Sequence, residues 1–143
     1  MTPKEFNLQE LVCFALYSTA NSMVREYRPE LDQFDLTYPQ FLVMMSLWNE
    51  DSIFIKELSH QTYLDAGTLT QVLKRLEAKG FIERQKSSVD ERAKVIVLTQ
   101  KGCDLKQKTS HILEDMACKV RLTAEEQQDL TSLCHKILSR LKK

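Results

Sequence analysis

The sequence predicts a mainly α-helical fold with a small β-wing, arranged as a winged helix-turn-helix. Three features between Asp65 and Thr99 support this: a capped helix, a glycine that ends it, and two short strands around a charged turn. Leucine and valine recur at helical spacing on one side of this helix, and polar and basic residues occupy the other side. One face is therefore expected to pack and the other to meet a partner.

The first half of the chain predicts three further helices. The first covers about residues 8–28 and is expected to end at Pro29, and the second covers about residues 39–49. The second helix is apolar on nearly all sides, which indicates a central position. A short helix over residues 55–61 then leads through a turn to Asp65, whose carboxylate can cap the next helix.

The second half predicts the wing and two long helices. Gly80 stands where a left-handed residue ends a helix, and the strand that begins at Phe81 is expected to pair with residues 95–98. Thr99 is a suitable N-cap for a helix that ends near residue 121. Thr123 and Glu126 have the spacing of a capping box for the last helix.

The length and apolar content predict one domain. The chain has 143 residues, of which 43% are hydrophobic, and this is enough for one globular core. We expect a single domain over residues 1–143, with the winged helix-turn-helix in residues 35–99 and dimerisation helices in residues 1–34 and 100–143. The outer helices carry more apolar surface than one small module can cover, which favours a homodimer over a purely intramolecular core.

Charge and hydropathy limit the class of protein. Apolar runs stay well below the roughly 20 residues that cross a bilayer, and the N-terminus does not resemble a secretion signal, so a cytoplasmic protein without membrane contact is expected. The formal net charge is zero, but residues 1–53 carry −5, residues 54–94 carry +2 and residues 95–143 carry +3. A neutral total weakens the expectation of nucleic-acid binding without removing it, because local charge forms the binding face.

The exposed side of the helix after Asp65 carries the candidate contacts to double-stranded DNA. In helix-turn-helix proteins the second helix enters the major groove, where its side chains reach base edges and phosphates. A basic pair on an exposed helix is also common where it is simply solvated. The candidates on this helix are Thr68, Thr70, Gln71, Lys74 and Arg75.

The turn between the two predicted strands supplies a second set of candidates. Arg92 stands at its tip, where an arginine can enter a narrow minor groove, and Asp90 is expected to hold the guanidinium in place. Lys86, Ser87 and Ser88 are expected to add phosphate contacts. A charged turn alone is weak evidence, but its position directly after a capped basic helix strengthens the DNA-binding interpretation.

The whole chain resembles the multiple antibiotic resistance regulator (MarR) family of dimeric winged helix-turn-helix transcription factors. Four segments are similar to its organic hydroperoxide resistance regulator (OhrR) branch: LVCFALY at 11–17, LTYPQFLVMMSLW at 36–48, YLDAGTLTQVLKRLEAKGFIER at 63–84 and VDER at 89–92. Ala66 and Gln71 depart from the usual pattern of the branch, which has serine and proline there. The resemblance implies a homodimeric repressor of a pseudo-palindromic operator, without a cofactor, which organic hydroperoxide releases.

The resemblance also gives Cys13 a role. Tyr17 lies four residues later on the same helical face, and phenol hydroxyls stabilise the thiolate that attacks a peroxide. From spacing alone, Cys13 fits an ordinary buried helix cysteine at least as well. In the OhrR pattern, however, Cys13, Tyr17, Tyr27 and Tyr38 match the peroxide-sensing cysteine and its tyrosines, and Tyr27 and Tyr38 are expected from the partner subunit.

Three further cysteines occur in the chain. The resemblance implies that Cys118 is a candidate resolving residue for two-cysteine members, acting across the dimer, while a small cellular thiol is the other route. Cys103 and Cys134 fit helix packing and are expected to be inert. The spacing of the cysteines and histidines does not match a zinc site, so no metal is expected.

Three other functions compete with the redox repressor. A MarR-type regulator could respond to a small phenolic or aromatic ligand, with the cysteines incidental. A thiol peroxidase, which would be an enzyme, is disfavoured because a wing would be superfluous for it. A winged-helix protein-interaction module is disfavoured by the basic helix and Arg92.

Overall fold

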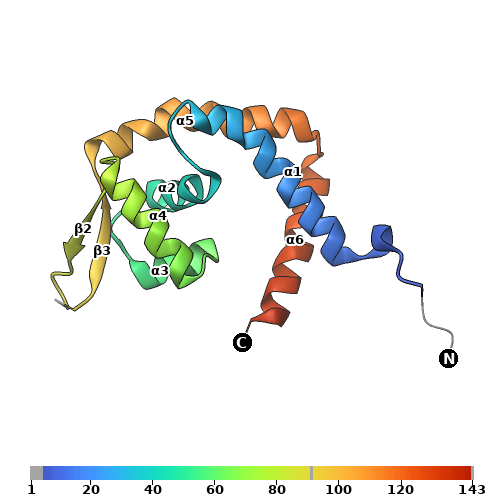
Figure 1. Cartoon of the computed structure of the whole chain (residues 1–143), viewed down its shortest axis with the longest axis horizontal. Helices are drawn as coiled ribbons and strands as arrows, with labels where there is room; N and C mark the ends of the chain where they lie inside the picture. The colour runs from blue at the N-terminus through green and yellow to red at the C-terminus, as the bar shows by residue number, and fades with distance from the viewer. Residues whose placement is uncertain (1–4, 91, 143) are drawn as a thin grey trace. The chain divides into compact units, whose positions relative to one another are not determined.

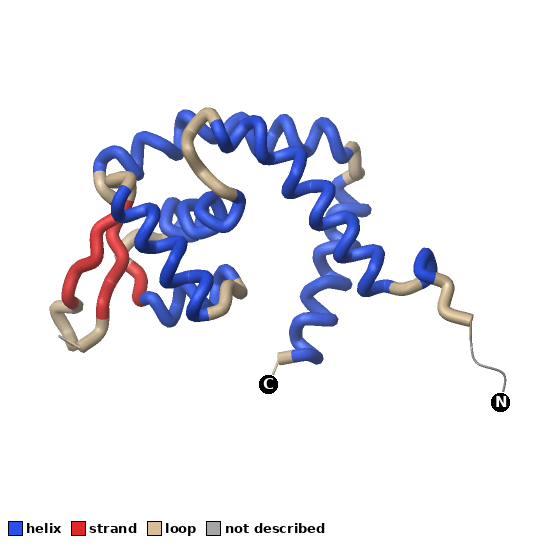
Figure 2. Tube along the Cα trace, in the orientation of Figure 1, coloured by secondary structure: helices blue, strands red, loops and turns tan. Residues whose placement is uncertain are grey.

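The computed structural model describes residues 5–90 and 92–142, and these divide into two compact units, one up to Ser110 and one from His111 onward. Helices dominate both units, and the strands lie in the first (Figures 1 and 2). In chain order the elements are η1 (Leu8–Glu10), α1 (Val12–Asp32), α2 (Tyr38–Asn49), β1 (Ile53–Phe54), α3 (Ile55–Thr62), α4 (Ala66–Ala78), β2 (Ile82–Lys86), β3 (Lys94–Leu98), α5 (Gln100–Val120) and α6 (Ala124–Leu141).

Helix α1 differs from its predicted bounds at both ends. It begins at Val12, after a short 3₁₀ turn that Asn7 caps, and it continues through Pro29 to Asp32. The prediction that Pro29 ends the helix was wrong. Proline removes one backbone donor, but only one turn follows it, and the burial of Leu31 at 1% exposure offsets that loss.

Helix α2 is the centre of the first unit, as its apolar sequence predicted. Phe41, Val43, Met44 and Leu47 are each at most 1% exposed. Thr37 caps the helix, because its side chain accepts from the backbone N–H of Gln40 at 3.3 Å while the Gln40 side chain accepts from the N–H of Thr37 at 3.2 Å. The predicted helix at residues 39–49 is therefore confirmed, and it begins one residue earlier.

Helices α3 and α4 form the predicted helix-turn-helix. Tyr63 ends α3 in a left-handed conformation with φ 58°, and the hydroxyl of Ser59 donates to the carbonyl of Leu64 at 3.0 Å. Asp65 caps α4 as expected, with Oδ1 accepting from the backbone N–H of Thr68 at 2.7 Å. The buried side of α4 packs against the rest of the first unit through Leu69, Val72, Leu73 and Leu76.

The wing strands β2 and β3 are antiparallel, and a third short strand joins them. Gly80 turns the chain from α4 into β2 with φ 81°. The sheet order is β1-β3-β2, with Ile53 opposite Ile96. Sequence patterning missed β1, because two residues are too few to show the alternation that predicts a strand.

The last two helices begin at the predicted caps. Thr99 Oγ1 accepts from the backbone N–H of Gly102 at 3.1 Å at the start of α5, and Thr123 and Glu126 form the capping box of α6. No residue of α6 is buried in the protomer. Among the described residues, none of the helices is long and apolar enough to cross a membrane.

Candidate functional site

The exposed face of α4 lies opposite its buried leucines. Thr68, Thr70, Gln71, Lys74 and Arg75 are all exposed. At about 100° per residue, Gln71 and Lys74 lie near the centre of this face, with Thr68 and Arg75 along one edge and Thr70 along the other. The structure therefore brings the predicted helix residues onto one surface, although the two threonines lie on opposite edges of it.

Both threonine hydroxyls on this face already donate their protons within the helix. Thr68 Oγ1 donates to Oδ2 of Asp65 at 3.0 Å, and Thr70 Oγ1 donates to the backbone carbonyl of Ala66 at 2.8 Å. A hydroxyl has one proton and two lone pairs. Toward an external partner, these threonines therefore present acceptors and methyl groups, while Gln71, Lys74 and Arg75 supply the donors.

Asp65 is ionised at neutral pH in this position. The backbone N–H and the hydroxyl of Thr68 both donate to it and lower the pKa of the carboxyl below its ordinary value. The start of α4 consequently carries a fixed negative charge beside the polar face. This charge disfavours a phosphate directly at the helix start and leaves phosphate contacts to Lys74, Arg75 and the wing.

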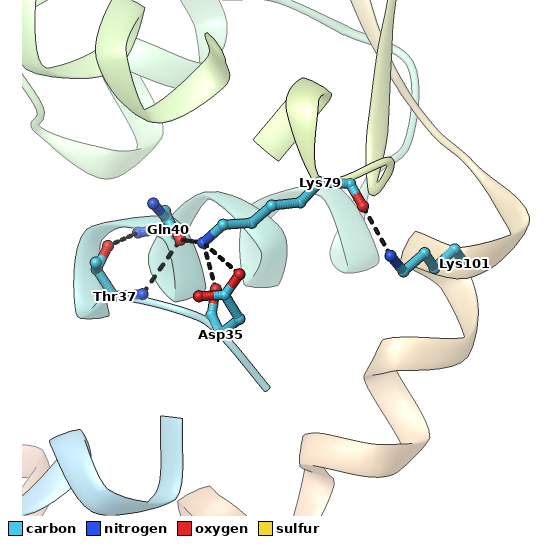
Figure 3. Close-up of polar contacts among 5 residues, drawn as sticks. All are labelled: Asp35, Thr37, Gln40, Lys79 and Lys101. Atoms are coloured by element: carbon cyan, nitrogen blue, oxygen red, sulfur yellow. Dashed lines mark hydrogen bonds and ion pairs between the residues drawn. The ribbon is translucent and has the colours of Figure 1, made fainter. Parts of the chain in front are cut away.

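The C-terminal end of α4 is attached to the connection between α1 and α2 (Figure 3). Lys79 Nζ donates to Oε1 of Gln40 at 2.8 Å, hydrogen-bonds to the carbonyl of Asp35 and lies 3.6 Å from its carboxylate. Lys101 Nζ donates to the carbonyl of Lys79 at 2.8 Å and lies 4.9 Å from the centroid of the Phe81 ring. The orientation of α4 is thus fixed by polar contacts as well as by its buried face.

Side chains of the described residues of the wing turn hydrogen-bond to its backbone. Asp90 Oδ1 accepts from the backbone N–H of Arg92 at 3.0 Å, so the carboxylate holds the backbone of Arg92 rather than its guanidinium, contrary to the sequence interpretation. Ser87 is buried, and its hydroxyl accepts from the N–H groups of Val89 and Asp90 at 3.2 and 3.3 Å, which does not fit the expected phosphate contact. Glu91, within the VDER segment, lies outside the described residues.

The pairing of β2 with β3 brings a further lysine, Lys94, into the candidate site, and the sequence analysis had not singled it out. Lys86, a predicted contact, lies directly opposite Lys94 in the β2–β3 ladder, and both are exposed. Like charges in opposite positions destabilise a strand pair unless an anion lies near them. Lys94 was missed because its importance depends on pairing between distant residues.

Glu77 attaches the wing to α4. Its Oε2 accepts from the backbone N–H of Arg84 at 3.3 Å, and its Oε1 lies 3.9 Å from Nε of Arg84. This contact gave no sequence signal, because a glutamate on a helix surface is ordinarily solvated. It fixes the basic wing beside the polar face of α4.

The predicted redox residues occupy two separate places. Cys13 and Tyr17 lie one turn apart on α1 and are both exposed, whereas the rings of Tyr27 and Tyr38 pack together with centroids 4.9 Å apart. Burial raises the pKa of both Tyr27 and Tyr38, and for Tyr27 the neighbouring Tyr38 adds to the increase, so both phenols are protonated donors at neutral pH. Tyr27 follows Cys13 by fourteen residues of α1, which is about 21 Å along the helix.

All four cysteines are free thiols. Cys118 on α5 is exposed, as its candidate role requires. Cys103 is also exposed, so within this protomer it does not occupy the packed position that the sequence suggested, and Cys134 is half-buried.

Comparison with known proteins identifies the family. The family described as transcriptional regulator SarA/Rot matches residues 25–109. The organic hydroperoxide resistance transcriptional regulator of Bacillus subtilis is 37% identical over 134 residues, which are 94% of this chain and 91% of the relative. The chain belongs to the MarR/SarA family of winged-helix transcriptional regulators.

Solved structures of this family share the fold. The structure of reduced AbfR, a Staphylococcus epidermidis protein, bound to DNA is similar with a TM-score of 0.77 and 28% identity, covering 91% of this chain and 90% of AbfR. Staphylococcus aureus MepR in complex with DNA has a TM-score of 0.80 and 25% identity, covering 96% of this chain and 100% of MepR. As a member of the MarR/SarA family, this chain is a transcriptional regulator and not an enzyme.

Proposed function

We propose that this regulator is a cytoplasmic homodimeric repressor that binds a pseudo-palindromic operator and is released when an organic hydroperoxide oxidises Cys13. The observation that carries the DNA-binding part is the exposed polar and basic face of α4, held beside a wing that presents Lys86, Lys94 and Arg92. In helix-turn-helix proteins the second helix enters the major groove. The wing then lies over the phosphates and the adjoining minor groove.

A second copy of the chain is proposed because large apolar side chains lack cover in the protomer. Phe6, Val12 and Tyr17 are 87%, 64% and 69% exposed, and Leu133 and Leu141 of α6 are 57% and 74% exposed. Large apolar side chains left exposed on the helices of both units favour burial against a second chain. The assignment of residues 1–34 and 100–143 to dimerisation remains a prediction. Two related copies would place two α4 helices on half-sites about one helical turn apart.

The partner subunit is also proposed to complete the sensing site. In a single chain, the 21 Å between Cys13 and Tyr27 along α1, about 1.5 Å per residue, prevents contact between the phenol and the sulfur. Because Tyr38 packs against Tyr27, it shares this position. We infer that each Cys13 takes Tyr17 from its own chain and the protonated phenols of Tyr27 and Tyr38 from the other.

The proposed reaction uses the hydroperoxide as its only oxidant. The Cys13 thiolate attacks the terminal oxygen of the hydroperoxide, the O–O bond breaks, and the alkoxide leaves and is protonated to an alcohol, while the sulfur becomes a sulfenic acid. The thiolate of Cys118 from the other chain then attacks the sulfenic sulfur, the S–O bond breaks as the S–S bond forms, and the departing hydroxide takes a proton from solvent to become water. The hydroperoxide function in the name of the Bacillus subtilis relative and the described reduced state of AbfR support a redox role.

The test compares DNA release in three proteins. Wild type treated with an organic hydroperoxide is expected to release a duplex that the wild-type protein selected from a random-sequence pool, whereas Cys13→Ser is expected to stay bound. Cys103→Ser is the matched control and is expected to behave as wild type. Release of Cys13→Ser by the peroxide would overturn the sensing assignment.

The resolving role of Cys118 needs a separate experiment. Non-reducing gel electrophoresis after peroxide treatment should give a covalent dimer in wild type and in Cys134→Ser, but not in Cys118→Ser. A covalent dimer that persists without Cys118 would exclude it as the resolving residue.

A second candidate function is favoured by a pocket in the first unit. It has a volume of about 550 Å³ and is lined by Phe34, Phe81 and Leu105 together with Lys79, Lys101 and Lys108. Gln33, Asp35 and Ala78 complete the lining, and the Asp35 carboxylate lies 3.6 Å from Nζ of Lys79, which leaves Lys108 and Lys101 nearest to an incoming acid. Aromatic walls with ammonium groups suit a small aromatic acid. Loss of DNA binding on addition of salicylate under reducing conditions, with every thiol unmodified by mass spectrometry, would favour this function over the redox one.

A further inference from the structure

The chain contains three glycines, and the fold requires two of them. Gly80 has φ 81°, a left-handed conformation that side chains disfavour. A Cβ on Gly102 would lie 2.1 Å from the carbonyl oxygen of Phe81, far inside contact distance. At Gly67, however, a Cβ would meet only Oδ1 of Asp65, at an ordinary contact distance of 3.5 Å. The fold therefore has room for a side chain at position 67.

Gly67 also lowers the stability of the helix that contains it. It is the second residue of α4, and glycine has more backbone freedom to lose on entering a helix than alanine has. An alanine at this position would fit the local space and favour the helix. A residue that costs stability without a reason inside the fold indicates a requirement from outside the fold.

The position of Gly67 indicates what that requirement is. Gly67 is exposed, and Gln71 and Lys74 follow it by four and seven residues, so the three share the outward face of α4. Gln71 and Lys74 are the central candidates for DNA contact. Gly67 thus occupies the end of this face nearest the helix start, which is the end that reaches base edges in helix-turn-helix proteins.

The negative charge of Asp65 bears on whether a base edge or a phosphate of the DNA lies near Gly67. Asp65 is ionised and lies beside Gly67, so a phosphate at this point would meet a negative charge. Base edges carry no net charge, and amino groups of cytosine and adenine can donate to a carboxylate. A base edge on the floor of the major groove therefore suits the position beside Gly67 better than a phosphate does.

We propose that Gly67 is a clearance position at which the bare backbone of α4 lies against base edges and thereby sets how deeply Gln71 and Lys74 reach into the groove. This inference rests on the proposed function, in that α4 must be the helix that reads DNA. It adds a specificity-determining residue whose contribution comes from the absence of a side chain.

The experiment measures stability and DNA affinity on the same variants. Gly67→Ala should raise the melting temperature, because alanine favours the helix. It should also weaken binding to a duplex selected by the wild-type protein by about tenfold, since a methyl group forced into a packed contact is costly. Binding to an unrelated duplex should change little, because phosphate contacts dominate non-specific binding. Ala78→Ser adds one atom to the same face eleven residues later and is expected to leave specific affinity near wild type.

Each other outcome contradicts part of the inference. If Gly67→Ala binds the selected duplex as tightly as wild type while Gln71→Ala binds it weakly, α4 reads DNA but Gly67 is not a clearance position. If neither variant changes the affinity, the proposed interface itself is wrong. A lower melting temperature for Gly67→Ala would mean that the fold does require glycine there, which also overturns the inference.

Discussion

Lys79, the C-cap residue directly after α4, donates from Nζ to Oε1 of Gln40 on α2 at 2.8 Å, and Gln40 is only 2% exposed. The same amide oxygen accepts from the backbone N–H of Thr37, so one buried side chain joins the start of α2 to the end of α4. A flexible lysine is thereby held in one conformation. Helix α4 cannot turn on its long axis without breaking this contact.

Replacement of Lys79 by methionine should therefore loosen α4. The variant removes the donor to Gln40 and the contacts to Asp35, and the free energy of unfolding should fall by about 1 kcal/mol. Urea denaturation measures this change, and the affinity for a selected duplex should fall several-fold because α4 is less firmly oriented. Lys106→Met, at an exposed position of α5, is the matched control. Unchanged stability and affinity in Lys79→Met would show that apolar packing alone fixes α4.

Asp65 should make stability depend on pH in the acid range. Its pKa in the folded protein is below the ordinary value of 3.8 because Thr68 donates to the ionised form. The contribution is therefore fully present above the unfolded pKa and is lost as the pH falls through the lowered folded pKa. Asp65→Asn keeps a capping oxygen but does not titrate, so its urea midpoint should fall less than that of wild type between about pH 6 and about pH 3. Equal decreases in the two proteins would contradict the assignment.

Asp90 should support DNA binding despite its negative charge. Electrostatics alone predicts that Asp90→Ala binds a polyanion more tightly. Its Oδ1 holds the backbone N–H of Arg92, however, so its loss should disorder the wing tip and weaken binding. Asp90→Asn keeps an acceptor oxygen and should bind at least as tightly as wild type. Tighter binding by Asp90→Ala in a fluorescence anisotropy titration would exclude this role.

Lys94 should contribute a phosphate contact that does not depend on sequence. Lys94→Ala also removes the repulsion from Lys86, so the protein should be unchanged or slightly more stable. Its affinity should fall by a similar factor for selected and unrelated duplexes. The dependence of log affinity on log salt should become shallower by about 0.9 for each subunit, or about 1.8 for the proposed dimer. Lys136→Ala, exposed on α6, provides the comparison. An unchanged salt dependence would place Lys94 away from the DNA.

Tyr38 should accelerate the reaction of Cys13 with peroxide from the other subunit. Tyr38→Phe keeps the ring that packs on Tyr27 but removes the protonated hydroxyl, so the fold should persist while sulfenic acid forms more slowly. Tyr63→Phe, at an exposed position of the turn between α3 and α4, should react like wild type. A mixed dimer of Cys13→Ser and Tyr38→Phe chains separates the two arrangements. In the proposed arrangement its remaining Cys13 meets the intact Tyr38 of the other chain and should react at the wild-type rate. A slow reaction there would mean that the tyrosine acts within its own chain.

Most of the fold could be predicted because its signals are local. The caps at Asp65, Thr99 and Thr123 and the turn at Gly80 depend on neighbouring residues, and the sequence contains those residues. The prediction that α1 ends at Pro29 was wrong because the burial of Leu31 in the packed protein outweighs the tendency of proline to end a helix. Strand β1 is stabilised by pairing with β3 and has almost no pattern of its own.

The sequence predicted which residues of α4 form the candidate site, but not the contacts that the wing residues make. The polar face of α4 follows directly from helical spacing, and all five predicted residues are exposed. The direction of the Asp90 hydrogen bond, the burial of Ser87 and the pairing of Lys86 with Lys94 depend on the backbone path of the wing. The backbone path of the wing depends on which residues of β2 and β3 pair, and local sequence patterns do not determine that pairing.

Helix α6, which has no buried residue in the protomer, has a consequence for gene dosage. Under the proposed dimer, folding of this helix and assembly of two chains are one reaction, whose midpoint depends on protein concentration. At low abundance the number of paired DNA-binding units then varies with the square of the chain concentration. Halving synthesis would reduce operator-competent regulator by about fourfold. The expression level of the regulator would itself set a threshold for repression, independently of any oxidant.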